Sequence, residues 1–308
     1  MSQTRRSSIL GTLLKMSAGA ALTVAGGALY VAWRLVNPGR VFVEVNIDAS
    51  RQYEQVWFRS AVDHLLLHGL YMRAAANAPH IILCHGYSSN LSQCYGIGRE
   101  LHALGYGVLL FDFRGAGQSS RKRVTVGWLE KRDLVGAVDF LRGRIRSDTP
   151  IGVLGYSMGG AVAIMAAAEN RQISAVVTDS AYAQLDAVIK YGIRRLPTST
   201  ARLFGALSIY ISERMSGYPT ARIRPLEHVA NVSPTPLLLI HGMDDSQISY
   251  ENALALYEHA HEPRHIWLVD GAGHCASYNR DPQRYVERIH GFFQKALVDE
   301  REAVFGPA

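Results

Sequence analysis

Six short apolar runs without regular polar alternation limit what this chain can fold into more than any other feature of its sequence. A strand that is apolar at every position must be covered on both faces, which is typical of parallel sheets. Helical patterns at residues 129–141, 159–169 and 252–260 lie between the runs and can supply the covers. The sequence therefore predicts an α/β protein with a mostly parallel, doubly wound sheet. The runs are His80–Cys84, Gly107–Asp112, Ile151–Leu154, Ser174–Thr178, Pro236–Ile240 and His265–Val269.

Two further parts complete this predicted domain. β-branched runs at residues 41–47, 55–58 and 64–72 predict antiparallel strands at one edge of the sheet. About fifty residues separate the runs that begin at Ser174 and Pro236, which is more than a crossover needs, so we expect a helical cap at about residues 183–232. Four apolar residues at helical spacing in this cap can line an apolar pocket or pack on the sheet. They are Leu203, Phe204, Leu207 and Ile211.

The amino-terminal segment has the composition of a membrane anchor. Residues 16–33 contain no ionisable side chain except Tyr30, and eighteen helical residues rise about 27 Å, close to the thickness of the hydrocarbon core. We predict a single-pass transmembrane anchor at residues 16–36 behind a basic tail at residues 1–15. A cleaved signal peptide is disfavoured because no A-x-A-like site follows the apolar stretch, and a buried helix is the other alternative. Basic residues nearly balance across the segment, and we place the large domain on the extracytoplasmic side.

The basic charge of the chain is spread over its length. Its formal net charge is +6, but no nucleic-acid recognition motif accompanies the basic residues, so we expect no nucleic-acid partner. Anionic membrane lipid is the more natural partner. Two basic groups either face such lipid or form a solvated surface. They are Arg121, Lys122 and Arg123 in one segment and Arg194, Arg195 and Arg202 in the cap.

The chain shows no metal-binding pattern. Its three cysteines are widely spaced without a C-x-x-C motif, so we interpret them as small buried hydrophobic residues. Histidines 259, 261 and 265 cluster near a predicted helix end, but they lack carboxylates at ligand spacing, and we expect them to be solvated. We therefore expect neither a metal ion nor an organic cofactor. The cysteines are Cys84, Cys94 and Cys275.

A candidate nucleophile lies in the segment Gly155–Gly159, which has the pattern G-x-S-x-G. A nucleophile on a tight turn between a strand and a helix needs a strained backbone, and glycines on either side relieve the resulting clashes. The segment follows a predicted strand and precedes an alanine-rich helix, so this context favours Ser157 as a nucleophile. The alternative is a glycine-rich helix start that holds a structural serine.

A serine nucleophile needs a base and an acid, and the sequence offers both after it. His274 follows the strand at residues 265–269 in a glycine-rich loop, where an imidazole can take the serine proton. Asp244 and Asp245 follow the strand before, and either carboxylate can orient the imidazole. Backbone amides must also bind the oxyanion, and we expect those of Tyr87 and Met158 to do so. The sequence therefore predicts a Ser-His-Asp triad.

With these residues the chain resembles the α/β-hydrolase superfamily from about Val41 to Leu297. It is most similar there to membrane-anchored or serine-aminopeptidase-like acyl hydrolases, which also show the pattern T-x-G-x-x-E-x-x-D found here at residues 125–133. The resemblance implies that Asp245 is the acid, that a hydrolase domain spans residues 41–300 before a short tail at 301–308, and that Asp112 and Arg114 are structural. The shared motifs, in order, are His85-Gly86, Asp112–Ser119, Gly155–Gly159, His241-Gly242-x-x-Asp245 and Gly273-His274.

One position departs from the superfamily pattern. Where many members have Asp-Gly in the second hairpin, this chain has Asp63-His64, which touches the edge of the fold and leaves the site unaffected.

The expected function is hydrolysis of small acyl or lipid-like carboxylic esters through an acyl-enzyme. A serine at the elbow disfavours epoxide hydrolase and haloalkane dehalogenase chemistry, which resembles versions with an aspartate there. Two alternatives remain: a serine aminopeptidase-like amidase, and a non-catalytic binding protein on the same scaffold. The second is disfavoured because such proteins usually lose a triad member. No feature of the sequence sets the oligomeric state.

Overall fold

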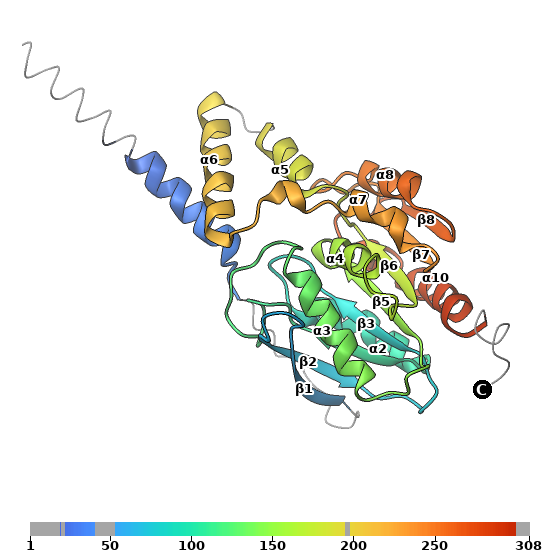
Figure 1. Ribbon diagram of the computed structural model, residues 1–308. Helices are drawn as coiled ribbons and strands as arrows, with labels where there is room; N and C mark the ends of the chain where they lie inside the picture. Colours follow the sequence, from blue (N-terminus) through green and yellow to red (C-terminus); the bar gives the residue numbers. More distant parts are fainter. Residues whose placement is uncertain (1–18, 20–21, 41–52, 195–197, 300–308) are drawn as a thin grey trace, which may run out of the picture.

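The computed structural model describes residue 19 and residues 22–40, 53–194 and 198–299 of the chain. Eight strands form one sheet in the order β1-β2-β4-β3-β5-β6-β7-β8 (Figure 1). Strand β2 runs antiparallel to β1 and β4, and every other neighbouring pair is parallel. The predicted α/β class with a mostly parallel sheet is therefore confirmed. The strands are β1 (Tyr53–Arg59), β2 (Leu66–Met72), β3 (His80–Cys84), β4 (Gly107–Phe111), β5 (Ile151–Tyr156), β6 (Ala175–Asp179), β7 (Leu237–Gly242) and β8 (Arg264–Val269).

The apolar runs became strands because both faces of the sheet are covered. Strands β3 to β7 are buried at every position, whereas the edge strand β8 is only partly buried. One cover contains α3 (Glu130–Arg142), α4 (Met158–Ala167) and α8 (Glu251–His259). The other contains α2 (Tyr95–Ala103) and α10 (Pro282–Gln294). The three helices expected at residues 129–141, 159–169 and 252–260 lie within two residues of their predicted bounds.

The strand order creates the crevice in which a site can form. Strand β3 lies between β4 and β5, so the chain reverses its direction of winding at β3 and the loops after β3 and β5 diverge. Ligands of open α/β sheets bind in such a crevice, at the carboxyl ends of the strands. The carboxyl end of β3 pairs with β5 through Cys84 and Gly155, which places the loop carrying Tyr87 beside the turn carrying Ser157.

Between β6 and β7 the chain forms the cap helices. Figure 1 shows α5 (Leu185–Arg194) and α6 (Ser199–Ser216) above the carboxyl edge of the sheet, followed by α7 (Pro225–His228). Gly217 follows the last residue of α6, and its φ of 83° suits a glycine after a helix. Short turns complete this segment: η2 (Thr220–Arg222) and η3 (Val229–Val232).

Two of the four apolar residues expected to line a pocket or to pack on the sheet do neither. Leu203 is 68% exposed, and the ring of Phe204 lies against Gly27 in the amino-terminal segment, where an added Cβ would meet it at 3.2 Å. These two residues therefore neither line a pocket nor pack on the sheet. The prediction was wrong for them because the helix at residues 22–36 offered a third surface that local spacing did not reveal.

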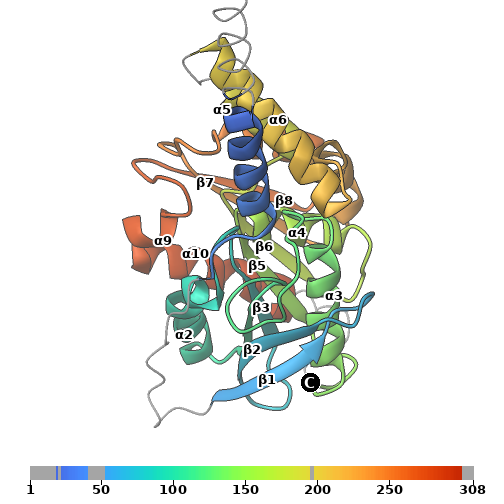
Figure 2. The same cartoon turned by 90° about the vertical axis from the view of Figure 1, so that its left-hand side faces the viewer.

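That amino-terminal helix, residues 22–36, contacts α6 where the ring of Phe204 meets Gly27, and Figure 2 shows the helix crossing near α6. Its buried face carries Ala28, Ala32 and Val36, spaced four residues apart. The amide of Val124 donates a hydrogen bond to the carbonyl of Val36 at 2.8 Å. Within the described residues, no helix is long and apolar enough to cross a membrane.

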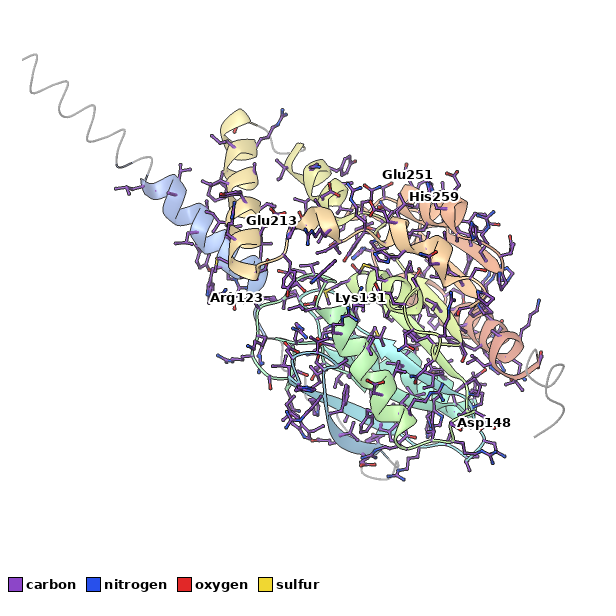
Figure 3. All side chains as sticks on the ribbon, viewed as in Figure 1. Arg123, Lys131, Asp148, Glu213, Glu251 and His259 are labelled. Carbon is purple, nitrogen blue, oxygen red and sulfur yellow. The ribbon has the colours of Figure 1, made fainter. Side chains whose placement is uncertain are left out.

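Several sequence predictions lie outside the described residues. These are the basic tail at 1–15, residues 16–18 and 20–21 of the predicted anchor, the strand at 41–47, Arg195 and the tail at 301–308. Of the basic residues expected to face lipid or solvent, Arg121, Lys122 and Arg123 are exposed, and Arg123 also donates to the carbonyl of Met215 near the end of α6. Figure 3 shows Arg123 below α6, near the base of the amino-terminal helix.

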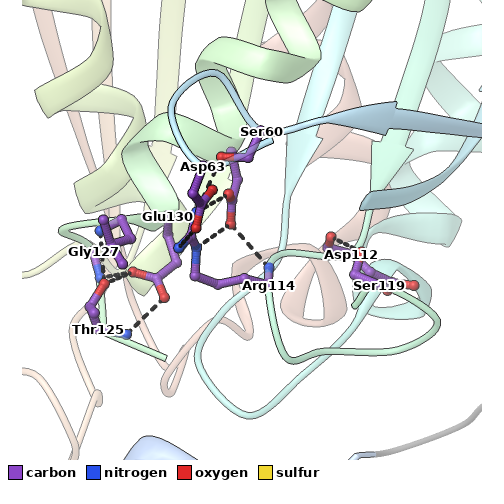
Figure 4. A network of polar contacts seen from close by, with 10 residues as sticks. Ser60, Asp63, Asp112, Arg114, Ser119, Thr125, Gly127 and Glu130 are labelled. Atoms are coloured by element: carbon purple, nitrogen blue, oxygen red, sulfur yellow. Dashed lines mark hydrogen bonds and ion pairs between the residues drawn. The ribbon is translucent and has the colours of Figure 1, made fainter. Parts of the chain in front are cut away.

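A buried polar network fixes the loop between β4 and α3 (Figure 4). The guanidinium of Arg114, only 1% exposed, donates to Asp133 at 2.6 Å and to Asp63 at 3.0 Å. The carboxylate of Glu130 accepts hydrogen bonds from the amide and hydroxyl of Thr125 and from the amide of Gly127. The pattern at residues 125–133 is thus a structural device that joins this loop to α3 and to the first hairpin.

Candidate active site

Ser157 lies on the strained turn that the glycine pattern predicted. It has φ 50° and ψ −112°, between the end of β5 and the start of α4. A Cβ on Gly155 would come within 2.3 Å of the Gly159 carbonyl oxygen, and a Cβ on Gly159 within 2.3 Å of the Cys84 carbonyl oxygen. Only glycine fits at both positions. The amide of Ser157 donates to the carbonyl of Asp179 at 2.8 Å, which secures the turn to β6.

His274 and Asp245 come to this serine from two other strand ends. The Nε2 atom of His274, in the loop after β8, lies 3.1 Å from the Oγ atom of Ser157. Its Nδ1 atom lies 2.7 Å from Oδ2 of Asp245, in the loop after β7. Asp244 is exposed, and its amide donates to the carbonyl of Ala272. The structure therefore brings together Ser157, His274 and Asp245, and it leaves Asp244 outside this line.

The carboxylate of Asp245 is held in its charged form. Burial alone would raise its pKa, but hydrogen bonds from His241 and His274 and from the amide of Ile248 outweigh burial and hold the pKa well below its usual value. Oδ1 accepts from the amides of Gln247 and Ile248, at 2.9 and 2.8 Å. A carboxylate fixed in this way can orient an imidazole and stabilise its protonated form.

The loop after β3 lies against the nucleophile. A Cβ on Gly86 would be 3.5 Å from the Cβ of Ser157, and Tyr87 and Met158 both line the cavity at Ser157. The imidazole of His85 is buried. It hydrogen-bonds the Gly86 carbonyl through Nδ1 and accepts from the amide of Phe113 through Nε2, a pattern that defines a neutral ring. The loop expected to supply one oxyanion donor is thus held rigidly.

Ser157 and His274 open into a cavity of about 430 Å³. Its walls come from the loop after β3, the start of α4, the cap helix α5 and the loops after β7 and β8. Apolar and polar groups share this wall, and Ser157 and His274 lie in it. The lining residues are Gly86, Tyr87, Gln93, Val126, Ser157, Met158, Tyr182, Leu185, Val188, Gln247, Ile248, His274 and Cys275.

Two supporting residues were missed by sequence reasoning. His241 lies 3.2 Å from the Asp245 carboxylate through Nε2, and Gln93 accepts a hydrogen bond from the Gly86 amide at 2.8 Å. His241 was visible as part of the H-G-x-x-D motif, and its spacing of four residues from Asp245 was the available signal. Gln93 carried no signal, because it reaches Gly86 from a short helix whose position depends on the whole fold.

A third support, also missed, holds the loop that carries His274. The hydroxyl of Ser180 accepts from the amide of Cys275 and donates to Oδ1 of Asp179, each at 3.0 Å. The hydroxyl of Ser277 also donates to this carboxylate. Burial raises the pKa of Asp179 to about 6. The available signal was the position of Asp179 and Ser180 at the carboxyl end of β6.

Within the described part of the chain, no three metal-binding side chains lie close enough to hold an ion. Of the three clustered histidines, His259 directs Nδ1 to the carbonyl of Ala255. Cys84 and Cys94 are buried free thiols, as expected for small hydrophobic residues, and Cys275 is partly buried.

Comparison with known proteins agrees with this fold. A family model described as the alpha/beta hydrolase fold matches residues 79–198. The uncharacterized protein YqkD of Bacillus subtilis is 29% identical over 225 residues, which cover 70% of this chain and 72% of that protein. The uncharacterized protein YfhR of Escherichia coli K12 is 29% identical over 221 residues, which cover 70% of each chain.

Solved structures give the same result. The esterase Pf2001 of Pyrococcus furiosus matches with a TM-score of 0.70 and 28% identity, over 85% of this chain and 98% of that one. The protein PA2218 of Pseudomonas aeruginosa matches with a TM-score of 0.67 and 20% identity, over 85% of this chain and 100% of that one. Architecture and comparisons together show that the chain has the α/β-hydrolase fold. The solved structures to which it is similar include esterases.

Proposed function

We propose that the protein is a serine hydrolase of carboxylic esters. The Oγ atom of Ser157 attacks the ester carbonyl carbon while Nε2 of His274 accepts the hydroxyl proton. His274 then gives this proton to the leaving alcohol, and the acyl group stays on Ser157. Water, deprotonated by the same imidazole, attacks the acyl-enzyme and releases the carboxylic acid and the free serine.

The observation that carries this proposal is the hydrogen-bonded line from Ser157 through His274 to Asp245 beside a cavity. The ionised Asp245 stabilises the imidazolium that forms when His274 takes the proton. The amides of Tyr87 and Met158 are the proposed oxyanion donors, each contributing about a hundredfold to a thousandfold in rate.

An ester substrate is favoured over an amino-terminal peptide. An aminopeptidase must bind a positively charged amino group, which calls for a carboxylate in the substrate cavity. No aspartate or glutamate is among the described residues that line this cavity. Similarity to the esterase Pf2001 agrees with the same choice.

Hydrolysis of p-nitrophenyl butyrate by the full chain tests the proposal. We expect Ser157→Ala to lower kcat by about ten-thousandfold or more, because the residue forms the covalent intermediate. Ser174→Ala is a matched control, since Ser174 lies at the opposite end of the sheet, where its hydroxyl accepts from the amide of Ile151. An unchanged rate in a folded Ser157→Ala protein, or faster cleavage of an alanine p-nitroanilide than of the ester, would contradict the proposal.

We also propose that residues 16–36 anchor the protein in a membrane as a single pass, with the hydrolase domain on the extracytoplasmic side. The support is an apolar surface on the described part of the amino-terminal helix that faces away from the domain. Leu29 is 52% exposed, Tyr30 63% and Trp33 47%. Leu203 and Tyr210 on the neighbouring helix α6 are exposed as well, at 68% and 54%. Aromatic side chains of this kind are frequent at membrane interfaces.

Extraction of a membrane fraction with alkaline carbonate tests the anchor. A single-pass anchor keeps the protein in the pellet, whereas its release into the supernatant would contradict the proposal. Protease added to sealed vesicles of known orientation then reports which side carries the hydrolase domain.

A further inference from the structure

A second cavity, of about 200 Å³, lies beside the catalytic cavity. Its walls come from the amino-terminal helix, the segment before α3, and helices α5 and α6. Leu35 and Val36 form the wall on the amino-terminal helix, and Ile209 lies on α6. We call this cavity the helix chamber. Figures 1 and 2 show the amino-terminal helix and α6 inclined to each other above the carboxyl edge of the sheet.

The helix chamber shares part of its wall with the catalytic cavity. Tyr87, Val126 and Leu185 line both cavities, so the two spaces are separated by single side chains. We propose that the helix chamber binds the distal part of the substrate acyl chain, so that the amino-terminal helix is a wall of the substrate site. This inference rests on the proposed ester hydrolase function and names the acyl chain as the group that determines specificity.

The chemistry of the chamber fits an aliphatic chain. Its wall is mostly apolar, and the polar groups at its end already have partners. The carboxylate of Glu213 accepts from the amide and the hydroxyl of Thr220, at 2.8 and 2.6 Å, and the hydroxyl of Ser212 donates to the Ile209 carbonyl. A polar ligand would have to displace these hydrogen bonds, whereas an alkyl chain leaves them intact.

The amino-terminal helix is attached where it meets both cavities. The hydroxyl of Tyr87 donates to the carbonyl of Leu35 at 2.8 Å, and the amide of Val124 donates to the carbonyl of Val36 at 2.8 Å. The residue expected to supply an oxyanion donor is therefore also the residue that ties this helix to the domain. The helix is a fixed wall of the chamber.

The wall that the two cavities share contains a residue with a strained backbone. Val126 has a φ of 53°, a left-handed conformation that a β-branched residue rarely adopts. The amides on either side of it, of Thr125 and Gly127, donate to Glu130, and the hydroxyl of Tyr182 donates to the Val126 carbonyl. Strain held in place by so many bonds is typical of functional sites. The hydrogen bonds within residues 125–133 therefore also shape the wall between the catalytic cavity and the helix chamber.

The test measures kcat/KM of the full chain in detergent on p-nitrophenyl esters from acetate to dodecanoate. We expect each methylene that enters the helix chamber to raise kcat/KM about fourfold, which corresponds to about 0.8 kcal/mol. Leu35→Trp and Ile209→Trp fill the chamber and should lower the ratio of kcat/KM for dodecanoate to kcat/KM for butyrate at least tenfold. Leu29→Trp and Tyr210→Trp are matched controls at exposed positions of the same two helices.

A smaller side chain in the chamber should have the opposite effect on chain-length preference. It also keeps the test valid if the bulky variants misfold. Ile209→Ala should shift the preferred ester to a longer chain. The same chain-length profile in wild type, Leu35→Trp and Ile209→Ala would overturn the inference while leaving the ester hydrolase function intact. Absence of hydrolysis of every ester by wild type would instead defeat the proposed function.

Binding of a fluorescent long-chain fatty acid separates these two failures, because it needs no turnover. Binding to wild type that is lost in Leu35→Trp but kept in Leu29→Trp supports the chamber even without hydrolysis. Equal binding by all three proteins would overturn the chamber. If the fatty acid binds in this pattern while the ester profile is flat, the chamber holds a lipid chain from the bilayer in place of the substrate, and the inference fails.

Discussion

The carboxyl edge of the sheet and the layer above this edge, formed by the amino-terminal helix and the cap helices α5 and α6, are held in different ways. We call this layer the cover. At the edge, Ser157, Asp245 and His274 are each fixed by hydrogen bonds from several strand ends. In the cover, the amino-terminal helix meets the domain through two carbonyls and small apolar side chains, and it leaves large apolar residues exposed. In the proposed function, the edge carries out the reaction and the layer above it selects the substrate.

The largest expected effect tests the edge through two adjacent aspartates. Asp245→Asn should lower kcat about ten-thousandfold, because the amide no longer holds His274 in the right tautomer. Asp244→Asn should change kcat less than twofold, since Asp244 is exposed and lies outside the triad. Steady-state kinetics of the two variants on p-nitrophenyl butyrate give the comparison. Equal losses in both would show that the acid was assigned wrongly.

A pair of glycines compares the packing of the two regions. Gly159→Ala should lower the free energy of unfolding by about 3 kcal/mol, because its Cβ would lie 2.3 Å from a backbone oxygen. Gly192→Ala in α5 has nothing within 4 Å of the new Cβ and should raise stability by about 0.5 to 1 kcal/mol. Urea unfolding measures both. A stable Gly159→Ala protein would mean that the elbow is less tightly packed than described.

The buried carboxyl behind the histidine loop predicts a pH dependence. Burial raises the pKa of Asp179 to about 6 in the folded protein, above its value of 3.8 when unfolded, so this group makes folding less favourable as pH rises from about 4 to about 6. Asp179→Asn should remove this penalty. Its stability relative to wild type should rise by about 2 to 3 kcal/mol between pH 4 and pH 7. The exposed Asp270→Asn serves as control, and a pH-independent difference for Asp179→Asn would refute the assignment.

The smallest effect concerns the bond that joins the cover to the edge. Tyr87→Phe keeps the backbone amide but removes the hydroxyl that donates to Leu35. We expect a loss of about 1 kcal/mol in stability and less than a twofold change in butyrate turnover. A large fall in butyrate turnover would show that the two regions are coupled more strongly than their contacts indicate.

The edge could be predicted from sequence because local rules fix it. A run buried on both faces specified each central strand, and the glycines around Ser157 specified the elbow through a clash that any Cβ would cause. His274 followed from its place in a glycine-rich loop after a strand. Asp244 and Asp245 could not be separated by composition alone, because both end the same strand, and the resemblance to the superfamily favoured Asp245.

The cover could not be predicted in the same detail. The spacing of residues in α6 indicated a helix, but its packing against the helix at residues 22–36 depends on contacts between parts of the chain far apart in sequence. The left-handed backbone of Val126 also has no local signal, since β-branched residues avoid that conformation. It arises from the bonds that Glu130 and Tyr182 make around it.

Covalent labelling by a fluorophosphonate tests the central claim most directly. Such a reagent reacts with a serine only when a base activates it, so it reports the assembled triad without requiring a known substrate. The full chain in detergent should form a single adduct, which mass spectrometry of its peptides places on Ser157, and the rate of labelling should fall sharply in Asp245→Asn. A folded protein that forms no adduct, or carries it on another serine, would contradict the account.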